Sequence, residues 1–177
     1  DDSLARVSES EYAISHETLA TLKAVDVGSF RSKKFANTYI PLLKEAFDCK
    51  PKKSKIFVEI KPSRISFNEL DQMVETDVIS KLNTHFLGFY PNVVKGLIKR
   101  FDIPATLSII PAFFDYNYEK ISSFLEKSKS FGISQHIDSK KSMNLIKKFK
   151  EEGKYCIAWT VNLSLIHISE PTRLAWI

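Results

Sequence analysis

The sequence has few of the features that mark membrane-spanning, disulfide-rich or dinucleotide-binding proteins. Its two cysteines, Cys49 and Cys156, are far apart and match no metal or redox spacing. Its apolar runs all stay well below the roughly 18 residues that a membrane-spanning helix needs. The chain has five glycines, and no glycine-rich turn follows its first predicted strand, which argues against a dinucleotide-binding fold. These absences leave a globular domain without a transmembrane segment.

The composition is that of an ordinary globular protein with a surplus of lysine. The chain has 177 residues, of which 44% are hydrophobic and 27% charged, enough for one domain with a substantial core. The net charge is +5, and lysines cluster over residues 50–55 and 140–150. Aromatic residues do not alternate with these lysines as a stacking surface for bases requires. The lysines are therefore interpreted as a solvated surface, and no nucleic-acid partner is expected.

One stretch, residues 55–62, reads as a buried strand ended by a proline. Side chains two apart on a strand point to the same face, so Glu59 and Lys61 share a face with Phe57. A carboxylate beside an ammonium group suits a site that holds a metal ion and an anion together. The simpler alternative is a salt bridge at a strand end, and spacing alone favours that alternative.

Predicted strands and helices alternate along the rest of the chain. Strands are predicted over 56–61, 85–89, 105–110, 131–134 and 155–161. Helices are predicted after a cap at Ser15 as far as Gly28, over 40–47, after a cap at Ser66 as far as Leu82, over 91–101, over 118–129, and from a cap at Asp138 or Ser139 to Gly153. Apolar strands alternating with amphipathic helices imply a parallel sheet, either doubly wound or part of a (β/α)8 barrel. In a barrel the carboxyl ends of the strands carry the chemistry, which would place Glu59, Lys61 and Trp159 at the site.

Five segments in order resemble motifs of the glycerophosphodiester phosphodiesterase family. They are Asp-Asp-Ser-Leu-Ala-Arg at 1–6, the Leu-x-x-Leu-Lys-x-x-Asp-x-Gly-Ser stretch at 19–29, Ile-Pro-Leu-Leu at 40–43, Glu-Ile-Lys at 59–61 and Trp-Thr-Val-Asn at 159–162. Gly88-Phe89 stands where the family often has Ser-Phe. The resemblance implies an α/β fold, a partial (β/α)8 TIM barrel of the phospholipase-C-like phosphodiesterase type without its first strands and last βα unit.

The resemblance also implies a reaction and a site. The reaction is metal-dependent hydrolysis of small-molecule glycerophosphodiesters to an alcohol and glycerol 3-phosphate. Glu59 would be one ligand of a divalent cation, Mg²⁺ or Ca²⁺, and Lys61 would meet the phosphate. Trp159 would line the substrate groove near the glycerol, although packing in the barrel core fits this position equally well.

The family's other catalytic groups have no counterpart in the sequence. Two histidines and a Glu-x-Asp pair would precede Asp1, and His16, His85 and His136 do not occupy matching positions. His85 and His136 are assigned to a strand start and a loop. We therefore expect this chain to hold one of three metal carboxylates and neither catalytic histidine, and to be inactive by itself.

The last residues resemble no protein motif. Residues 163–173 resemble the in-frame translation of a transposase-type sequencing adapter, and 174–177 would then be index sequence. We expect the native domain to be residues 1–162 and set aside 163–177, including His167. The compartment, the preferred alcohol group, the metal and the oligomeric state are left open.

Two alternatives compete with a glycerophosphodiesterase. One is a barrel relative that has lost its catalytic groups and serves as a binding module. The other is a related phosphodiesterase acting on lysophospholipids.

Overall fold

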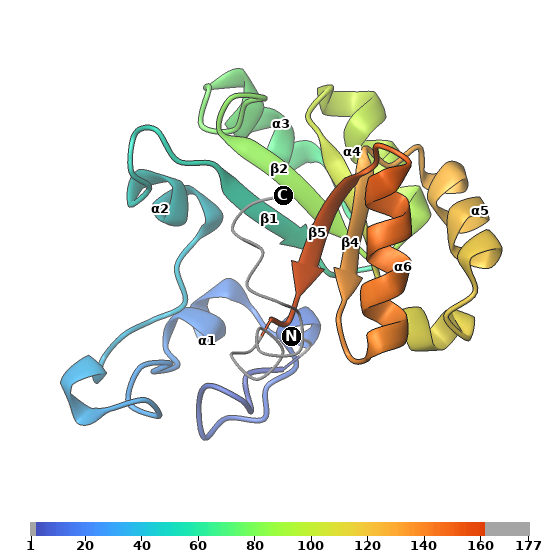
Figure 1. The fold of residues 1–177 in the computed structure, drawn as a ribbon. Coiled ribbons are helices and arrows are strands. Elements are labelled where there is room, and N and C mark those ends of the chain that lie inside the picture. Colours follow the sequence, from blue (N-terminus) through green and yellow to red (C-terminus); the bar gives the residue numbers. More distant parts are fainter. Residues whose placement is uncertain (1–2, 162–177) are drawn as a thin grey trace. The chain divides into compact units, whose positions relative to one another are not determined.

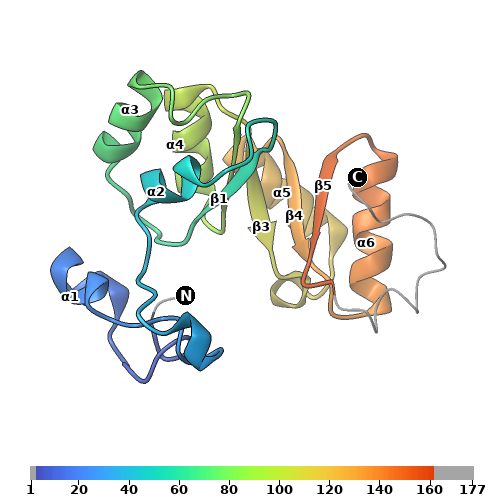
Figure 2. The same cartoon turned by 90° about the vertical axis from the view of Figure 1, so that its left-hand side faces the viewer.

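The computed structural model describes residues 3–161, which divide into two compact units (Figures 1 and 2). The first unit ends at Lys52 and the second begins at Lys53. None of the helices within residues 3–161 has the length and apolar character required to span a bilayer.

The first unit contains only short helical segments. They are η1 (Ile14–His16), α1 (Leu19–Lys23), η2 (Lys33–Phe35) and α2 (Leu43–Asp48). The predicted cap at Ser15 was wrong, because α1 begins after Thr18, whose side chain accepts a hydrogen bond from the backbone N–H of Thr21 at 3.1 Å. Asp26 fixes the following loop by accepting hydrogen bonds from the Gly28, Ser29 and Asn37 backbone N–H groups and from the Ser29 hydroxyl.

The second unit is built on a five-stranded parallel sheet. Its strands are β1 (Ile56–Ile60), β2 (Thr84–Gly88), β3 (Ala105–Ile109), β4 (Gly132–His136) and β5 (Tyr155–Trp159). The strands lie in the order β1-β2-β3-β4-β5, and every neighbouring pair is parallel. All five predicted strands are confirmed, although β4 lies one to two residues further along the chain than predicted.

This strand order decides between the two architectures. A doubly wound sheet reverses its strand order at a switch point so that helices cover both faces. Here the order follows the sequence without a reversal, and right-handed crossovers then place every connecting helix on the same face. The sheet is therefore an arc of the kind found in a (β/α)8 barrel, which confirms the predicted fold class.

Each crossover in the second unit contains a helical segment. These are α3 (Asn68–Glu75), α4 (Pro91–Phe101), η3 (Pro111–Phe114) with α5 (Tyr118–Ser128), and α6 (Lys140–Glu151). Pro91 and Ser139 begin α4 and α6 as predicted. Helix α3 is shorter than predicted: its N-cap residue is Phe67 instead of Ser66, whose hydroxyl accepts only a long hydrogen bond of 3.5 Å from the Asn68 backbone N–H, and the helix ends well before Leu82.

The core lies between one face of the sheet and these helices. Helix α4 packs on β2 and β3, and α6 packs on β4 and β5 (Figure 1). The side chains buried in this layer are Val58, Ile60, Phe86, Leu107, Ile109 and Ile133 from the strands and Val94, Leu97, Ile121, Leu145 and Phe149 from the helices. Cys156 is buried here as well, and burial raises the pKa of its thiol to about 11.

The other face of the sheet is concave. Phe89, just after β2, and Trp159, at the end of β5, have ring centroids 5.9 Å apart. His85 on β2 and Tyr155 on β5 stack at 5.2 Å. In a flat sheet, strands separated by three spacings would lie about 14 Å apart. The sheet must therefore curve around these side chains, as the wall of a barrel does.

Candidate active site

On the concave face, one layer of side chains lies toward the amino ends of the strands and another lies at their carboxyl ends. The strand register pairs Phe57 with His85 and Tyr155 with Gly132 toward the amino ends, and His136 with Trp159 at the carboxyl ends. The carboxyl-end layer contains the predicted site residues, and the amino-end layer beneath it consists of packed aromatic rings.

His85 is the centre of the amino-end layer. Its exposed fraction is 3%, and its Nε2 lies 2.5 Å from the Thr106 hydroxyl. The rings of Phe57, Phe131 and Tyr155 surround it at centroid distances of 5.2–6.0 Å. Burial, with a smaller contribution from the charge of Lys55, lowers its pKa to about 4. Such a neutral, buried imidazole packs the barrel interior.

Glu59 and Lys61 lie at the carboxyl end of β1. Their side chains form an ion pair and are 33% and 42% exposed, respectively. Lys61 Nζ also lies 6.0 Å from the centroid of the Phe89 ring, within the range of a cation–π contact. Because both groups are partly exposed, a ligand can replace either partner of the ion pair: an anion can bind the ammonium group, and a cation can bind the carboxylate.

Trp159 ends β5 at the same edge of the sheet. Its ring contacts Phe89 edge-on and lies 4.8 Å from the imidazole of His136. Its indole Nε1 is buried and forms no hydrogen bond with any residue in 3–161. Trp159 thus connects β5 to β2 across the concave face by packing, and its role in lining a substrate groove stays a prediction.

A polar pair continues this layer beyond Trp159. His136 is the last residue of β4, whereas the sequence suggested that it lies in a loop. Its Nδ1 lies 4.0 Å from Asp138 Oδ2, which accepts a hydrogen bond of 3.0 Å from the Tyr116 hydroxyl. Burial disfavours the ionised form of Asp138, but hydrogen bonds from Ser139, Ser142 and Tyr116 outweigh it and lower the pKa of the carboxyl.

We call this layer the rim cluster. It consists of Glu59, Lys61, Phe89, Trp159, His136 and Asp138. Sequence reasoning identified three of the six. Phe89 could have been predicted, because strand alternation and the parallel register place it on the same face as Glu59 and Lys61. His136 and Asp138 were harder to predict, because they lie at the end of the strand with the weakest sequence signal.

The rim cluster supplies little of a metal site by itself. Glu59 offers oxygen ligands of the kind that Mg²⁺ and Ca²⁺ prefer. Among residues 3–161, however, no three His, Cys, Asp or Glu side chains gather as a metal site requires. Glu59 therefore fits a single ligand, and these residues do not define a complete metal centre.

Comparison with known proteins agrees with this architecture. Residues 1–174 match the model of the glycerophosphoryl diester phosphodiesterase family. A search of curated proteins finds no match.

Solved structures with the same fold include two bacterial proteins. A phosphodiesterase from Oleispira antarctica, solved with its product sn-glycerol 3-phosphate, has a TM-score of 0.70 at 20% identity, and the match covers 95% of this chain and 68% of the other. A protein from Agrobacterium tumefaciens assigned as a glycerophosphoryl diester phosphodiesterase has a TM-score of 0.74 at 18% identity, with coverage of 94% and 68%. At these identities the likeness shows the fold.

The family match spans nearly the whole sequence, and the fold agrees with it. The chain belongs to the glycerophosphoryl diester phosphodiesterase family of phosphoric diester hydrolases.

Proposed function

We propose that Glu59 and Lys61, with Phe89 and Trp159 beside them, form the phosphate-binding part of a site that hydrolyses glycerophosphodiesters to an alcohol and glycerol 3-phosphate. The observation that carries this proposal is the pair of Glu59 and Lys61 at the carboxyl end of β1, partly exposed and beside Phe89 and Trp159. The product complex of the Oleispira antarctica phosphodiesterase supports the choice of substrate class.

Each residue has a role that follows from its chemistry. The ammonium group of Lys61 would bind the non-bridging oxygens of the phosphodiester and stabilise the charge that grows on them during displacement. Phe89 and Trp159 would pack against the carbon chain of the substrate and exclude water from it.

The native domain is proposed to be residues 1–162.

Glu59 would contribute one oxygen ligand to a divalent cation, Mg²⁺ or Ca²⁺. Such an ion, when bound, would neutralise part of the charge of the phosphodiester. Because Glu59 and Lys61 pair with each other, a cation that binds Glu59 would also release Lys61 for the substrate.

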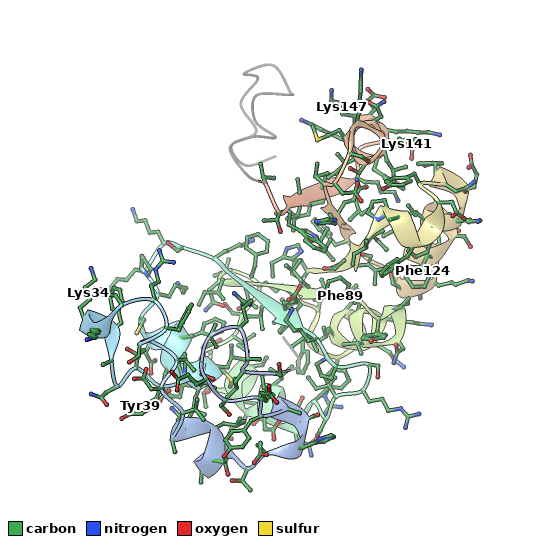
Figure 3. The ribbon with its side chains drawn as sticks, turned by 90° about the horizontal axis from the view of Figure 1, so that it is seen from below. Lys34, Tyr39, Phe89, Phe124, Lys141 and Lys147 are labelled. Carbon is green, nitrogen blue, oxygen red and sulfur yellow. The ribbon has the colours of Figure 1, made fainter. Side chains whose placement is uncertain are left out.

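Binding of the product tests the phosphate site directly. Glycerol 3-phosphate is titrated into the protein by isothermal calorimetry in millimolar Mg²⁺ or Ca²⁺. Lys61→Met removes a charge-assisted contact, and its affinity should fall about 10- to 100-fold. Lys147 is an exposed lysine on α6 outside the rim cluster (Figure 3). Lys147→Met is therefore the matched control and should bind like the wild type. Equal affinities for the two variants would overturn the phosphate site.

Sequencing of the gene on both sides of the codons for residues 1–162 tests the reaction. Upstream codons for a Glu-x-Asp pair and two histidines support hydrolysis. That longer reading frame should then release glycerol 3-phosphate from glycerophosphocholine, followed by ³¹P NMR. An upstream sequence without these groups would leave a barrel relative that binds phosphate esters without cleaving them.

A further inference from the structure

The rim cluster extends beyond the groups that would bind phosphate. From Lys61 it passes over the Phe89 ring and the Trp159 ring, with successive separations of 6.0 and 5.9 Å, and reaches the imidazole of His136 after another 4.8 Å. Its two ends differ in chemistry. A cation and an anion mark one end, two aromatic rings form the middle, and His136 with Asp138 forms the other end.

His136 has unused hydrogen-bonding capacity. Within residues 3–161 neither of its ring nitrogens forms a hydrogen bond, since its 4.0 Å separation from Asp138 exceeds hydrogen-bonding distance. Its side chain is 32% exposed, so a ligand can reach it. Neutral imidazole offers one donor and one acceptor, and the carboxylate of Asp138 adds acceptors.

Several contacts hold this polar end in place. The ring of His136 packs on Trp159. Asp138 accepts hydrogen bonds from the Tyr116 and Ser139 hydroxyl groups at 3.0 and 2.9 Å. The backbone N–H of Ile137 donates to the Trp159 carbonyl at 2.6 Å, which ties β4 to β5 between the two rings. A fixed acceptor group can select a ligand because an unmatched polar group is left unpaired.

We propose that His136, with Asp138 beside it, is a specificity-determining residue that accepts hydrogen bonds from a donor group on an ester arm of the substrate. This proposal rests on the phosphate site proposed above. With the phosphate at Lys61, the carbon chain of the arm lies over Phe89 and Trp159, and its donor reaches His136. A glycerol hydroxyl and the ammonium of an ethanolamine ester both supply such a donor.

Matched ligands separate these sources. Glycerol 3-phosphate and n-propyl phosphate have the same carbon chain and differ in two hydroxyl groups. Phosphoethanolamine carries an ammonium group instead, and inorganic phosphate has no arm. Binding is followed by tryptophan fluorescence in a Trp176→Phe background, which leaves Trp159 as the remaining one of the two tryptophans.

Two variants separate hydrogen bonding from packing. His136→Phe keeps a ring against Trp159 but has no nitrogen. His136→Asn keeps a polar group near the position of Nδ1 but has no ring. The parent protein should bind glycerol 3-phosphate or phosphoethanolamine about tenfold more tightly than n-propyl phosphate, because one net hydrogen bond is worth about 1 kcal/mol.

The proposal expects His136→Phe to lose that preference and His136→Asn to retain part of it, while both keep their affinity for inorganic phosphate. If His136→Phe loses the preference for glycerol 3-phosphate, the donor is a glycerol hydroxyl. If it loses the preference for phosphoethanolamine, the donor is the ammonium group. An unchanged preference in His136→Phe, or no preference for either donor arm in the parent protein, overturns this inference alone. Failure of all four ligands to bind overturns the phosphate site on which it rests.

Discussion

Glu59 and Lys61 lie two residues apart at the end of β1 and form an ion pair on the concave face of the sheet. In this pair the carboxylate holds the ammonium that would otherwise be available to an anion. Removal of the carboxylate should therefore act in opposite directions with and without a divalent cation.

Glu59→Gln should bind glycerol 3-phosphate several-fold more tightly than the wild type in metal-free buffer, because Lys61 loses its competing partner. The same variant should lose the gain in affinity that Mg²⁺ or Ca²⁺ gives the wild type. Calorimetric titrations with chelator and with metal measure both effects. Glu69→Gln, a change of an exposed carboxylate on α3, serves as control. A metal-dependent gain that persists in Glu59→Gln would remove Glu59 from the metal site.

His85 predicts how stability depends on pH. Its pKa in the folded protein is lowered to about 4, so below pH 6.5 the unfolded chain binds a proton that the folded protein does not. The free energy of unfolding should therefore fall as the pH is lowered from about 6.5 to about 4, by about 3 kcal/mol for this group. His85→Gln retains a partner for Thr106 and should remove this part of the pH dependence.

The test for His85 is urea unfolding of the wild type and His85→Gln at several pH values between 4 and 8. The difference between the two proteins isolates the histidine from the carboxylates, which titrate in both. A difference that does not change with pH would show that His85 is not a buried neutral imidazole.

Gly132 lies where β4 meets β5 too closely for a side chain. A Cβ at this position would lie 2.0 Å from the carbonyl oxygen of Tyr155, its partner in the register. Gly132→Ala must push β5 away or break the pairing, and it should destabilise the protein by about 3 kcal/mol.

Gly153 provides the matched glycine control for this change. It has a φ of +78° and open space around it. Gly153→Ala should cost about 1 kcal/mol, from backbone strain alone. If thermal unfolding shows the same loss for both alanine variants, the close approach of β4 and β5 is wrong.

Ser139 should stabilise the start of α6. Its hydroxyl accepts a hydrogen bond from the Ser142 backbone N–H at 3.2 Å, and Ser139→Ala should cost about 1 kcal/mol. Ser139→Thr should retain most of the stability. Asn144→Ala, an exposed change in the middle of the same helix, should be neutral within about 0.5 kcal/mol. Equal stability of Ser139→Ala and the wild type would mean that the cap contributes nothing.

The sequence was sufficient where local physics dominates. Buried parallel strands are continuous apolar runs, so all five were predicted close to their observed bounds, and a proline at the first position of α4 and a serine before α6 marked two helix starts correctly. It failed at α1, where several hydroxyl residues compete for one cap and Thr18, not Ser15, is the one that binds the backbone. The family motifs pointed to Glu59, Lys61 and Trp159, which lie at the carboxyl ends of β1 and β5, and their roles stay predictions.

Tertiary structure decided what no single segment contains. The choice between a barrel arc and a doubly wound sheet depends on strand order, which is set by how distant segments pair. The contact of Phe89 with Trp159 exists because the sheet curves and brings β2 and β5 together, whereas Trp159 meets His136 because β4 and β5 pair in this register. Sequence periodicity assigns a side chain to a face of its own strand, but curvature and register determine which side chains from different strands meet there.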